Sequence, residues 1–246
     1  MAWAVCWVAF SAESKKQAVG VGSGAVSTAS LKPTKKAHGF GGEPFFVGQN
    51  PYFTTMTDRL LQQINGIVPL NEMEQQAFVA ITTTRHLRKR ELLMREGDSC
   101  QTITFVHTGS LRLFHNVDGE EKTIQFFFEN AWYTDYRSFL TGQPTIENAQ
   151  ALEACDLIQF SRAGLEQIYR QYPVFERYGR FAAEQAFLSL STRNVMLTNQ
   201  TPEARYQQLI QDRPNLFQRV PQYHIASFLG IKPESLSRIR KRMATR

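Results

Sequence analysis

Cysteine is scarce in the sequence, and the cysteines that are present form no recognisable site. Cys6, Cys100 and Cys155 are odd in number and far apart, so they provide neither a disulfide framework nor a CxxC metal site. They also fall short of the ligand set of an iron–sulfur cluster. This scarcity indicates a reducing compartment, and we expect a cytoplasmic protein.

Long apolar runs are also missing. No stretch approaches the roughly 18 apolar residues that indicate a transmembrane helix. The apolar opening at residues 1–12 has no basic residue before it, which makes it a poor signal peptide. We therefore expect no membrane partner.

The motifs of common enzyme classes are absent as well. The sequence has no GxSxG elbow, no P-loop and no GxGxxG loop between a strand and a helix. His86, His107 and His115 occur in one region, but without an HxH pair or a clear third metal ligand. We expect no metal, no cofactor and no catalysis, and a metal-dependent β-barrel enzyme is the least favoured alternative.

What the sequence does have is an uneven distribution of charge. The formal net charge is +6, yet residues 232–246 alone hold six basic residues and one acidic residue. Residues 1–55 hold five lysines and two glutamates, whereas residues 56–231 hold 17 basic and 19 acidic residues. Basic ends on an otherwise near-neutral chain favour a polyanion as the partner of one module.

The residue patterns divide the chain into four parts and indicate the α+β class. Residues 1–55 show no sustained period, so we expect a disordered extension, with Met56 as an alternative start of the protein. Residues 56–172 are expected to form a β-rich domain with flanking helices. Residues 173–199 are expected to form one long helix, and residues 200–246 a helical domain.

Between Thr84 and Phe160 polar and apolar residues alternate with a period of two. The β-branched and aromatic runs are separated by turn signals at Gly97-Asp98, Gly109-Ser110 and Asp118-Gly119. Asp-Gly between alternating strands is a strong signal for a two-residue hairpin. Several short strands with glycine turns indicate a compact antiparallel β-roll or barrel.

Pro173 introduces the longest helical pattern, roughly Val174 to Thr198. Apolar residues recur along it at heptad spacing, which usually means burial against a partner helix, and in a symmetric dimer against its own copy. A helix packed only on its own domain is the alternative. The residues expected at the dimer interface are Val174, Tyr178, Phe181, Leu188 and Val195.

The stretch from Gln222 to Lys241 has the spacing of two short helices joined by a tight turn. Gly230 lies where the turn needs a permissive backbone, and Pro233 suits the first position of the second helix. This is helix-turn-helix spacing, and the basic second helix makes it a candidate DNA-binding element.

Two side chains of the second helix could contact bases. Glu234 and Arg238 are four positions apart and share a face. A glutamate can accept a hydrogen bond from cytosine N4, and an arginine can bind guanine O6 and N7. An ion pair between the same two residues on a solvated helix is the alternative.

These elements, in this order, resemble the CRP/FNR family of bacterial transcription regulators. The segments REGD, HTGSLRLF and Arg205–Met243 carry the resemblance, which covers about residues 60–243. It implies a cyclic-nucleotide-binding-like β-roll (a double-stranded β-helix), a homodimer joined along the long helix, a palindromic double-stranded DNA operator, and RNA polymerase as a partner. It also implies DNA contacts at Gln222, Tyr223, Glu234, Ser235, Ser237, Arg238, Arg240, Lys241 and Arg242. A ligand-free roll that only docks another protein is the second alternative.

The sequence departs from the family at the phosphate-binding cassette of the roll. Members that bind cyclic nucleotides carry Gly-Glu-Leu and then Arg-Ser or Arg-Thr, whereas this chain has Thr134-Asp135-Tyr136 and Glu147-Asn148-Ala149. An acidic residue in place of the arginine would repel a cyclic phosphate. We therefore expect an unidentified effector that is not cyclic AMP or GMP, with Arg137 as the only substitute for the missing arginine. The family's wing hairpin is expected to be absent or very short, since the sequence ends at Arg246.

Overall fold

A computed structural model of the protein describes residues 51–244, with side chains from Met56 to Met243. Helix α1 (Pro51–Asn65) begins at its proline, so the expectation that organised structure starts near Met56 is wrong for residues 51–55. Proline fits the first position of a helix because its missing N–H needs no partner there. Met56, Leu60 and Ile64 form the buried face of α1. The expectation for residues 1–50 lies outside the described residues.

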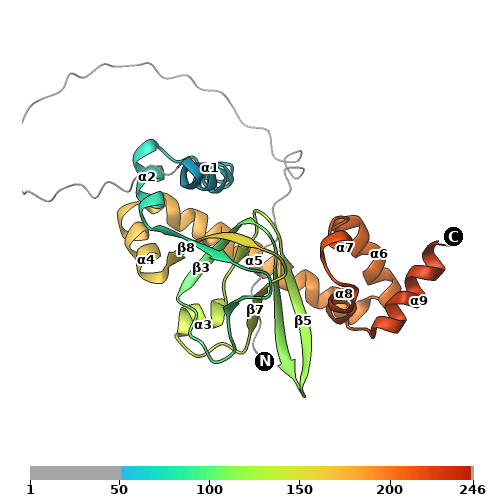
Figure 1. Ribbon diagram of the computed structural model, residues 1–246. Coiled ribbons are helices and arrows are strands. Elements are labelled where there is room, and N and C mark those ends of the chain that lie inside the picture. The colour runs from blue at the N-terminus through green and yellow to red at the C-terminus, as the bar shows by residue number, and fades with distance from the viewer. Residues whose placement is uncertain (1–50, 245–246) are drawn as a thin grey trace, which may run out of the picture.

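Two antiparallel four-stranded sheets form the β-roll that the alternating pattern predicted (Figure 1). One sheet has the order β1-β8-β3-β6 and the other has the order β2-β7-β4-β5. The strands are β1 (Thr82–Leu87), β2 (Leu92–Met94), β3 (Thr102–Thr108), β4 (Leu111–Val117), β5 (Glu120–Phe127), β6 (Trp132–Tyr133), β7 (Asn148–Ala151) and β8 (Cys155–Ser161).

The predicted glycine turns connect these strands. Asp118 and Gly119 have φ angles of 53° and 79°, and they join β4 to β5 with Val117 opposite Glu120. Gly109 has a φ angle of 87°, and a Cβ atom there would lie 2.3 Å from the carbonyl oxygen of Ala154. A side chain at position 109 is therefore excluded both by backbone conformation and by space.

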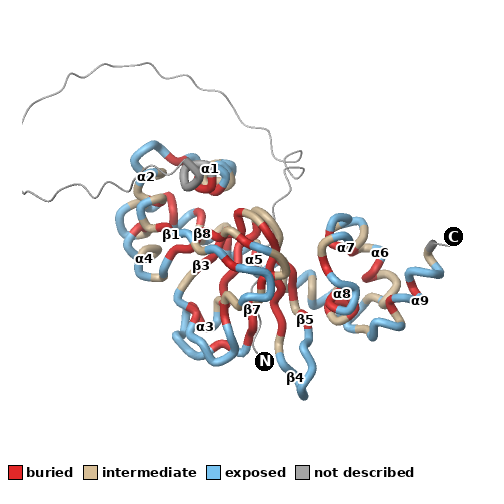
Figure 2. Tube along the Cα trace, in the orientation of Figure 1, coloured by how far each residue is buried: buried red, intermediate tan, exposed pale blue. Residues whose placement is uncertain are grey.

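Helices cover one end of the roll and share its core. Helix α2 (Glu72–Ala80) follows α1, helix α4 (Arg162–Gln171) packs on β8 and α5, and α3 (Tyr136–Thr141) lies between β6 and β7 in the sequence. Phe78 of α2 stacks on Phe175 and meets the edge of Phe160. Trp132 packs on both Phe105 and Phe160, so strands and helices are joined through one aromatic core. Figure 2 shows that the strands of the roll are largely buried, whereas the tip of the β4–β5 hairpin is exposed.

Helix α5 (Pro173–Asn199) runs from α4 to the C-terminal helices (Figure 1). Its bounds agree with the predicted long helix, but its predicted heptad interface divides into two parts. Val174 and Tyr178 are only 7% and 8% exposed because they pack into the core of the roll, so their assignment to a dimer interface is wrong. Leu188 and Val195 are 55% and 53% exposed, and Phe181 is half-buried. The first half of the helix follows the alternative, packing on its own domain.

The C-terminal part is entirely helical within the described residues. It comprises α6 (Pro202–Asp212), α7 (Leu216–Arg219), α8 (Gln222–Phe228) and α9 (Pro233–Ala244). Thr201 caps α6 by accepting from the backbone N–H of Ala204. Gly230 takes a φ angle of 70° in the turn between α8 and α9, where the sequence predicted a permissive backbone. A second apolar core holds these helices together, and Phe126 from β5 of the roll belongs to it.

No helix among residues 51–244 is both long enough and apolar enough to span a membrane.

Candidate DNA interface and sensor site

Helix α9 is amphipathic, and its polar face is basic. Leu236 and Ile239 are 1% and 3% exposed in the second apolar core, which orients the rest of the helix towards solvent. Ser235 is half-buried at the margin. The exposed residues of the helix include Glu234, Ser237, Arg238, Arg240, Lys241 and Arg242, all predicted DNA contacts. The structure thus gathers these predicted contacts on one helix with their charges at the surface.

Arg238 is oriented by its own helix. Its Nη2 atom donates to Oγ of Ser235 at 3.1 Å, which holds the guanidinium over the exposed face. No ion pair joins Glu234 to Arg238 within residues 51–244. The structure therefore does not contain the i,i+4 ion pair that was the alternative to base contacts. Both side chains keep hydrogen-bonding capacity that bases could use.

A groove of about 740 Å³ separates α9 from the start of α6. Arg242 reaches across it and forms an ion pair with Glu203. One of the predicted cationic contacts is therefore partly neutralised by an acidic residue of the same domain. The groove is lined by Pro202, Glu203, Ile231, Ser235, Arg238, Ile239, Lys241 and Arg242.

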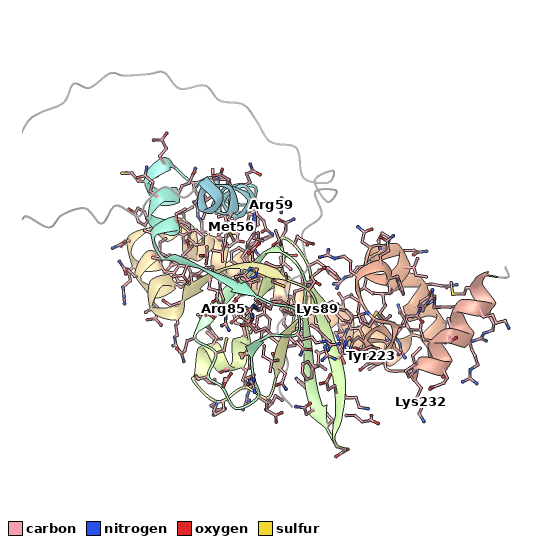
Figure 3. All side chains as sticks on the ribbon, in the orientation of Figure 1. Met56, Arg59, Arg85, Lys89, Tyr223 and Lys232 are labelled. Atoms are coloured by element: carbon pink, nitrogen blue, oxygen red, sulfur yellow. The ribbon has the colours of Figure 1, made fainter. Side chains whose placement is uncertain are left out.

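The other predicted contacts lie at the first turn of α8. Gln222 and Tyr223 are both exposed, and the Tyr223 ring is packed on its neighbour His224, with ring centroids 4.0 Å apart. Figure 3 shows Tyr223 close to the junction between the roll and the C-terminal helices, whereas Lys232 lies at the start of α9. The start of α8 is thus beside both the roll and the basic helix.

A buried arginine joins the roll to α8, and sequence reasoning missed it. Arg112 of β4 is 1% exposed, and its Nη1 atom donates to Nδ1 of His224 at 2.6 Å. Its Nη2 atom donates to Glu121 at 2.5 Å and to Gln150 at 3.2 Å. The guanidinium also lies 4.0 Å from the centre of the Phe114 ring. Because arginine has no acceptor atom, Nδ1 of His224 must be the acceptor, and His224 is neutral in this arrangement.

Further contacts cross the same junction. The hydroxyl of Ser227 accepts from the backbone N–H of Thr123 and donates to the carbonyl oxygen of Glu121. Phe126 of β5 packs on Phe228 of α8, with ring centroids 5.4 Å apart. The hairpin β4–β5 therefore holds α8 through backbone, apolar and charged contacts together.

Arg219 makes the second charged link. It binds Glu129 through both Nη atoms, at 2.7 and 2.8 Å, and also binds Glu153. Burial alone would raise the pKa of Glu129, but the hydrogen bonds from Arg219 lower it below its usual value. Glu129 also accepts from the backbone N–H of Gly109, so this link is anchored in the turn between β3 and β4.

The predicted phosphate cassette is occupied by the chain's own polar groups. Asp135 is 2% exposed, and its carboxylate caps α3 by accepting from the backbone N–H of Ser138 at 3.1 Å. Thr134 is fully buried, and its hydroxyl donates to the carbonyl oxygen of Thr102. Arg137, the candidate substitute for the missing arginine, is exposed and donates to Oε1 of Gln143 at 2.8 Å.

The acidic residue expected in place of that arginine points into the roll. Glu147 is 1% exposed, and its Oε1 atom lies 4.0 Å from Nε2 of His115, too far for a hydrogen bond. Its Oε2 atom has no hydrogen-bond partner among residues 51–244. Burial, with a smaller contribution from Asp135, raises the pKa of Glu147. Asn148 faces the other way and accepts from the backbone N–H of Glu96 at 3.1 Å.

Metal ligands do not cluster in the part of the chain that the structure describes. No group of three or more His, Cys, Asp or Glu side chains there could hold an ion. His86 pairs with Asp156 at the surface, and His107 is buried in β3 away from His115.

The chain can be compared with known proteins at this point. Residues 84–172 match the family model of the cyclic nucleotide-binding domain. No curated protein sequence matches the chain. The chain is similar in structure to FixK2 from Bradyrhizobium japonicum, with a TM-score of 0.59 and 16% identity over 67% of this chain and 85% of that chain.

Two further solved structures show the same likeness. The c-di-GMP responsive global regulator CLP from Xanthomonas campestris gives a TM-score of 0.55 and 17% identity over 71% of this chain and 92% of that chain. A CooA mutant from Carboxydothermus hydrogenoformans gives a TM-score of 0.55 and 14% identity over 75% of this chain and 84% of that chain. At these identities the likeness establishes the fold.

The docking of α8 on the roll should weaken in mild acid. Burial, and then the charge of Arg112, lower the pKa of His224 from 6.5 to about 4. Between these values the undocked or unfolded state takes up a proton that the docked state excludes, so docking loses free energy as the pH falls from 6.5 to 4. The protection factors of the α8 amides, which are the intrinsic exchange rates divided by the measured rates at the same pH, should therefore decrease as the pH falls over that range.

His224→Gln is the matched variant, because its amide oxygen can accept from Arg112 but does not titrate. The variant should lose little of this protection between pH 6.5 and pH 4 and should match the wild type at pH 8. An equal loss of protection in both proteins would show that His224 is not the titrating group.

Proposed function

We propose that this chain, whose residues 84–172 belong to the cyclic nucleotide-binding domain family and which has the fold of the CRP/FNR regulators, is a homodimeric transcription regulator that binds double-stranded DNA. The observation that carries the proposal is helix α9, which presents Arg238, Arg240 and Lys241 to solvent while its apolar face is buried. A helix of this kind at the end of a helix-turn-helix unit suits the major groove of DNA.

The two kinds of contact have separate roles in the proposal. Glu234 and Arg238, near the start of α9, contact base edges and specify sequence. Gln222, Tyr223, Arg240, Lys241 and Arg242 contact phosphates or flanking positions, and Ser235 and Ser237 lie at the margins. Phosphate contacts of this kind make binding depend steeply on salt concentration.

A dimer is supported by the second half of α5. Its apolar side chains remain exposed in the single chain, Leu188 at 55% and Phe187 at 70%. Apolar side chains of this size gathered on one helix are typical of an interaction site. In the proposed dimer the two α5 helices pack along this half, and the two copies of α9 read the half-sites of a palindromic operator.

The roll is the sensor domain in the proposal, and its effector is not a cyclic phosphate. Asp135 already caps α3, and the buried carboxyl group of Glu147 lies where an arginine would be needed. Among residues 51–244, the cassette would offer a cyclic phosphate the carboxyl groups of Asp135 and Glu147 and no arginine in place of Glu147. As a regulator of transcription, the protein would act in the cytoplasm with RNA polymerase as a partner.

Arg238 should determine base preference at one position of each half-site. Arg238→Ala is expected to cost about 1–3 kcal/mol on the preferred sequence and to relax the preference at that position, because a bidentate contact to guanine is lost. Lys241→Ala is the matched variant on the same helix. It should weaken binding to all sequences by a similar factor, and its binding should depend less steeply on salt concentration than that of the wild type. Binding to a panel of duplexes, each with a single base change, measures both effects. Identical losses for both variants on all sequences would disprove direct readout by Arg238.

Leu188 should hold the dimer together. Leu188→Lys places a charge in the exposed apolar half of α5, and we expect dimer dissociation to become at least about tenfold easier, since an unpaired charge would be buried. Met73→Lys is the control, because it places the same charge on an exposed apolar side chain of α2, outside α5. Sedimentation equilibrium measures the dissociation constants, and a monomeric wild type would contradict the dimer itself.

A further inference from the structure

We infer that Arg112 positions the helix-turn-helix domain on the roll and thereby sets the half-site spacing that the dimer accepts. The inference deepens the proposed function and rests on it, because spacing has a meaning only if the two copies of α9 bind one DNA duplex. The observations that support it concern the junction itself and do not depend on DNA.

The first observation is how completely Arg112 is enclosed. Its planar guanidinium is 1% exposed and is fixed from three elements: His224 of α8, Glu121 of β5 and Gln150 of β7. The Phe114 ring, 4.0 Å away, closes one face of the group. Because the guanidinium is rigid and planar, its hydrogen bond to His224 fixes both the distance and the angle between α8 and β4.

The second observation is where Arg112 is attached to the helix-turn-helix domain. His224 follows directly after Gln222 and Tyr223, which are exposed at the start of α8. A shift of His224 therefore displaces both candidate phosphate contacts. Helix α9 would move with them, because Ile225, Leu229 and Leu236 share the second apolar core with less than about 2% exposure.

The third observation is that docking and DNA binding are compatible. Gln222, Tyr223, Arg238 and Lys241 all stay exposed while α8 is bound to the hairpin β4–β5. The junction thus leaves the candidate DNA-binding face open. Its effect is on orientation, so we assign Arg112 the role of a positioning residue.

The fourth observation separates Arg112 from the rest of the junction. Arg219 is about a quarter exposed, with 28% of its side chain accessible, so water can replace its partners when they are lost. Arg112 has no such access while α8 is docked, so a small rotation of α8 that admits no water would leave Nη1 without its His224 acceptor. A buried donor that loses its acceptor is unfavourable, so this contact resists small changes in the angle of α8.

Half-site spacing is the readout that distinguishes positioning from general stability. Two recognition helices of a dimer fit half-sites whose centres lie about 10 base pairs apart only if each domain is held at a fixed angle. In Arg112→Gln we expect binding to a full palindrome at the preferred spacing to weaken at least about tenfold. Binding to an isolated half-site should change less than about twofold. Inserting one base pair between the half-sites should reduce the DNA affinity of the variant by a smaller factor than it reduces the affinity of the wild type.

Variants of the partner provide the rescue test. His224→Gln keeps an acceptor for Arg112 and should retain wild-type spacing selectivity, whereas His224→Leu removes the acceptor and should behave like Arg112→Gln. Arg85→Gln is the control for loss of a roll arginine, since within residues 51–244 the hydrogen bonds of Arg85 go to the backbone of β2, away from the C-terminal helices (Figure 3). It should leave all DNA measurements unchanged.

Hydrogen exchange of the full chain without DNA completes the test. Exchange of the α8 amides should accelerate in Arg112→Gln and His224→Leu, while β3 and β8 stay as protected as in the wild type. Equal weakening on full and half sites, tighter binding, or unchanged α8 exchange would each overturn the inference. If the wild type binds no DNA while α8 exchange accelerates as expected, the proposed function and the spacing role fail together, but Arg112 still positions the domain.

Discussion

The burial of Arg112 between β4 and α8 is the contact on which the arrangement of the two halves of the molecule depends. A buried arginine is unfavourable unless it finds acceptors, and here both Nη atoms are matched by groups from the two halves, while Nε has no hydrogen-bond partner among the described residues. His224 must be neutral to serve as an acceptor, which links the junction to protonation. Phe126 extends the link by contributing a roll side chain to the apolar core of the C-terminal helices.

The same strand also borders the interior of the roll. Along β4, Arg112 and Phe114 face α8, whereas Leu113 belongs to the core of the roll and His115 approaches Glu147. Successive residues of a strand point to opposite faces, so side chains that face the interior of the roll and side chains that face α8 are one residue apart along β4. A structural change around Glu147 could therefore be transmitted to α8 through β4 alone. The Oε2 atom of Glu147 has no hydrogen-bond partner among the described residues, so it suits a ligand with a hydrogen-bond donor better than a phosphate.

Features set by local chemistry could be predicted from the sequence. Asp118-Gly119 requires two positive φ angles, Gly230 marks the turn before α9, and Pro173 opens α5, and each lies where the pattern indicated. The junction could not be predicted, because Arg112 and His224 are 112 positions apart and neither stands out in its own segment. The heptad pattern failed at Val174 and Tyr178 because spacing shows that a face is apolar but not which surface covers it. The start of α1 was missed because Pro51 precedes the apolar period that made Met56 look like the first ordered residue.

The central claim is that the chain reads DNA as a symmetric pair of α9 helices. Selection of bound duplexes from a pool of random sequences tests it most directly, because the selected sequences show preference, symmetry and spacing in one experiment. The account predicts an inverted repeat whose half-site centres lie about 10 base pairs apart, or a multiple of that distance. A pool without any enriched sequence, or with a single unrepeated half-site, would contradict it.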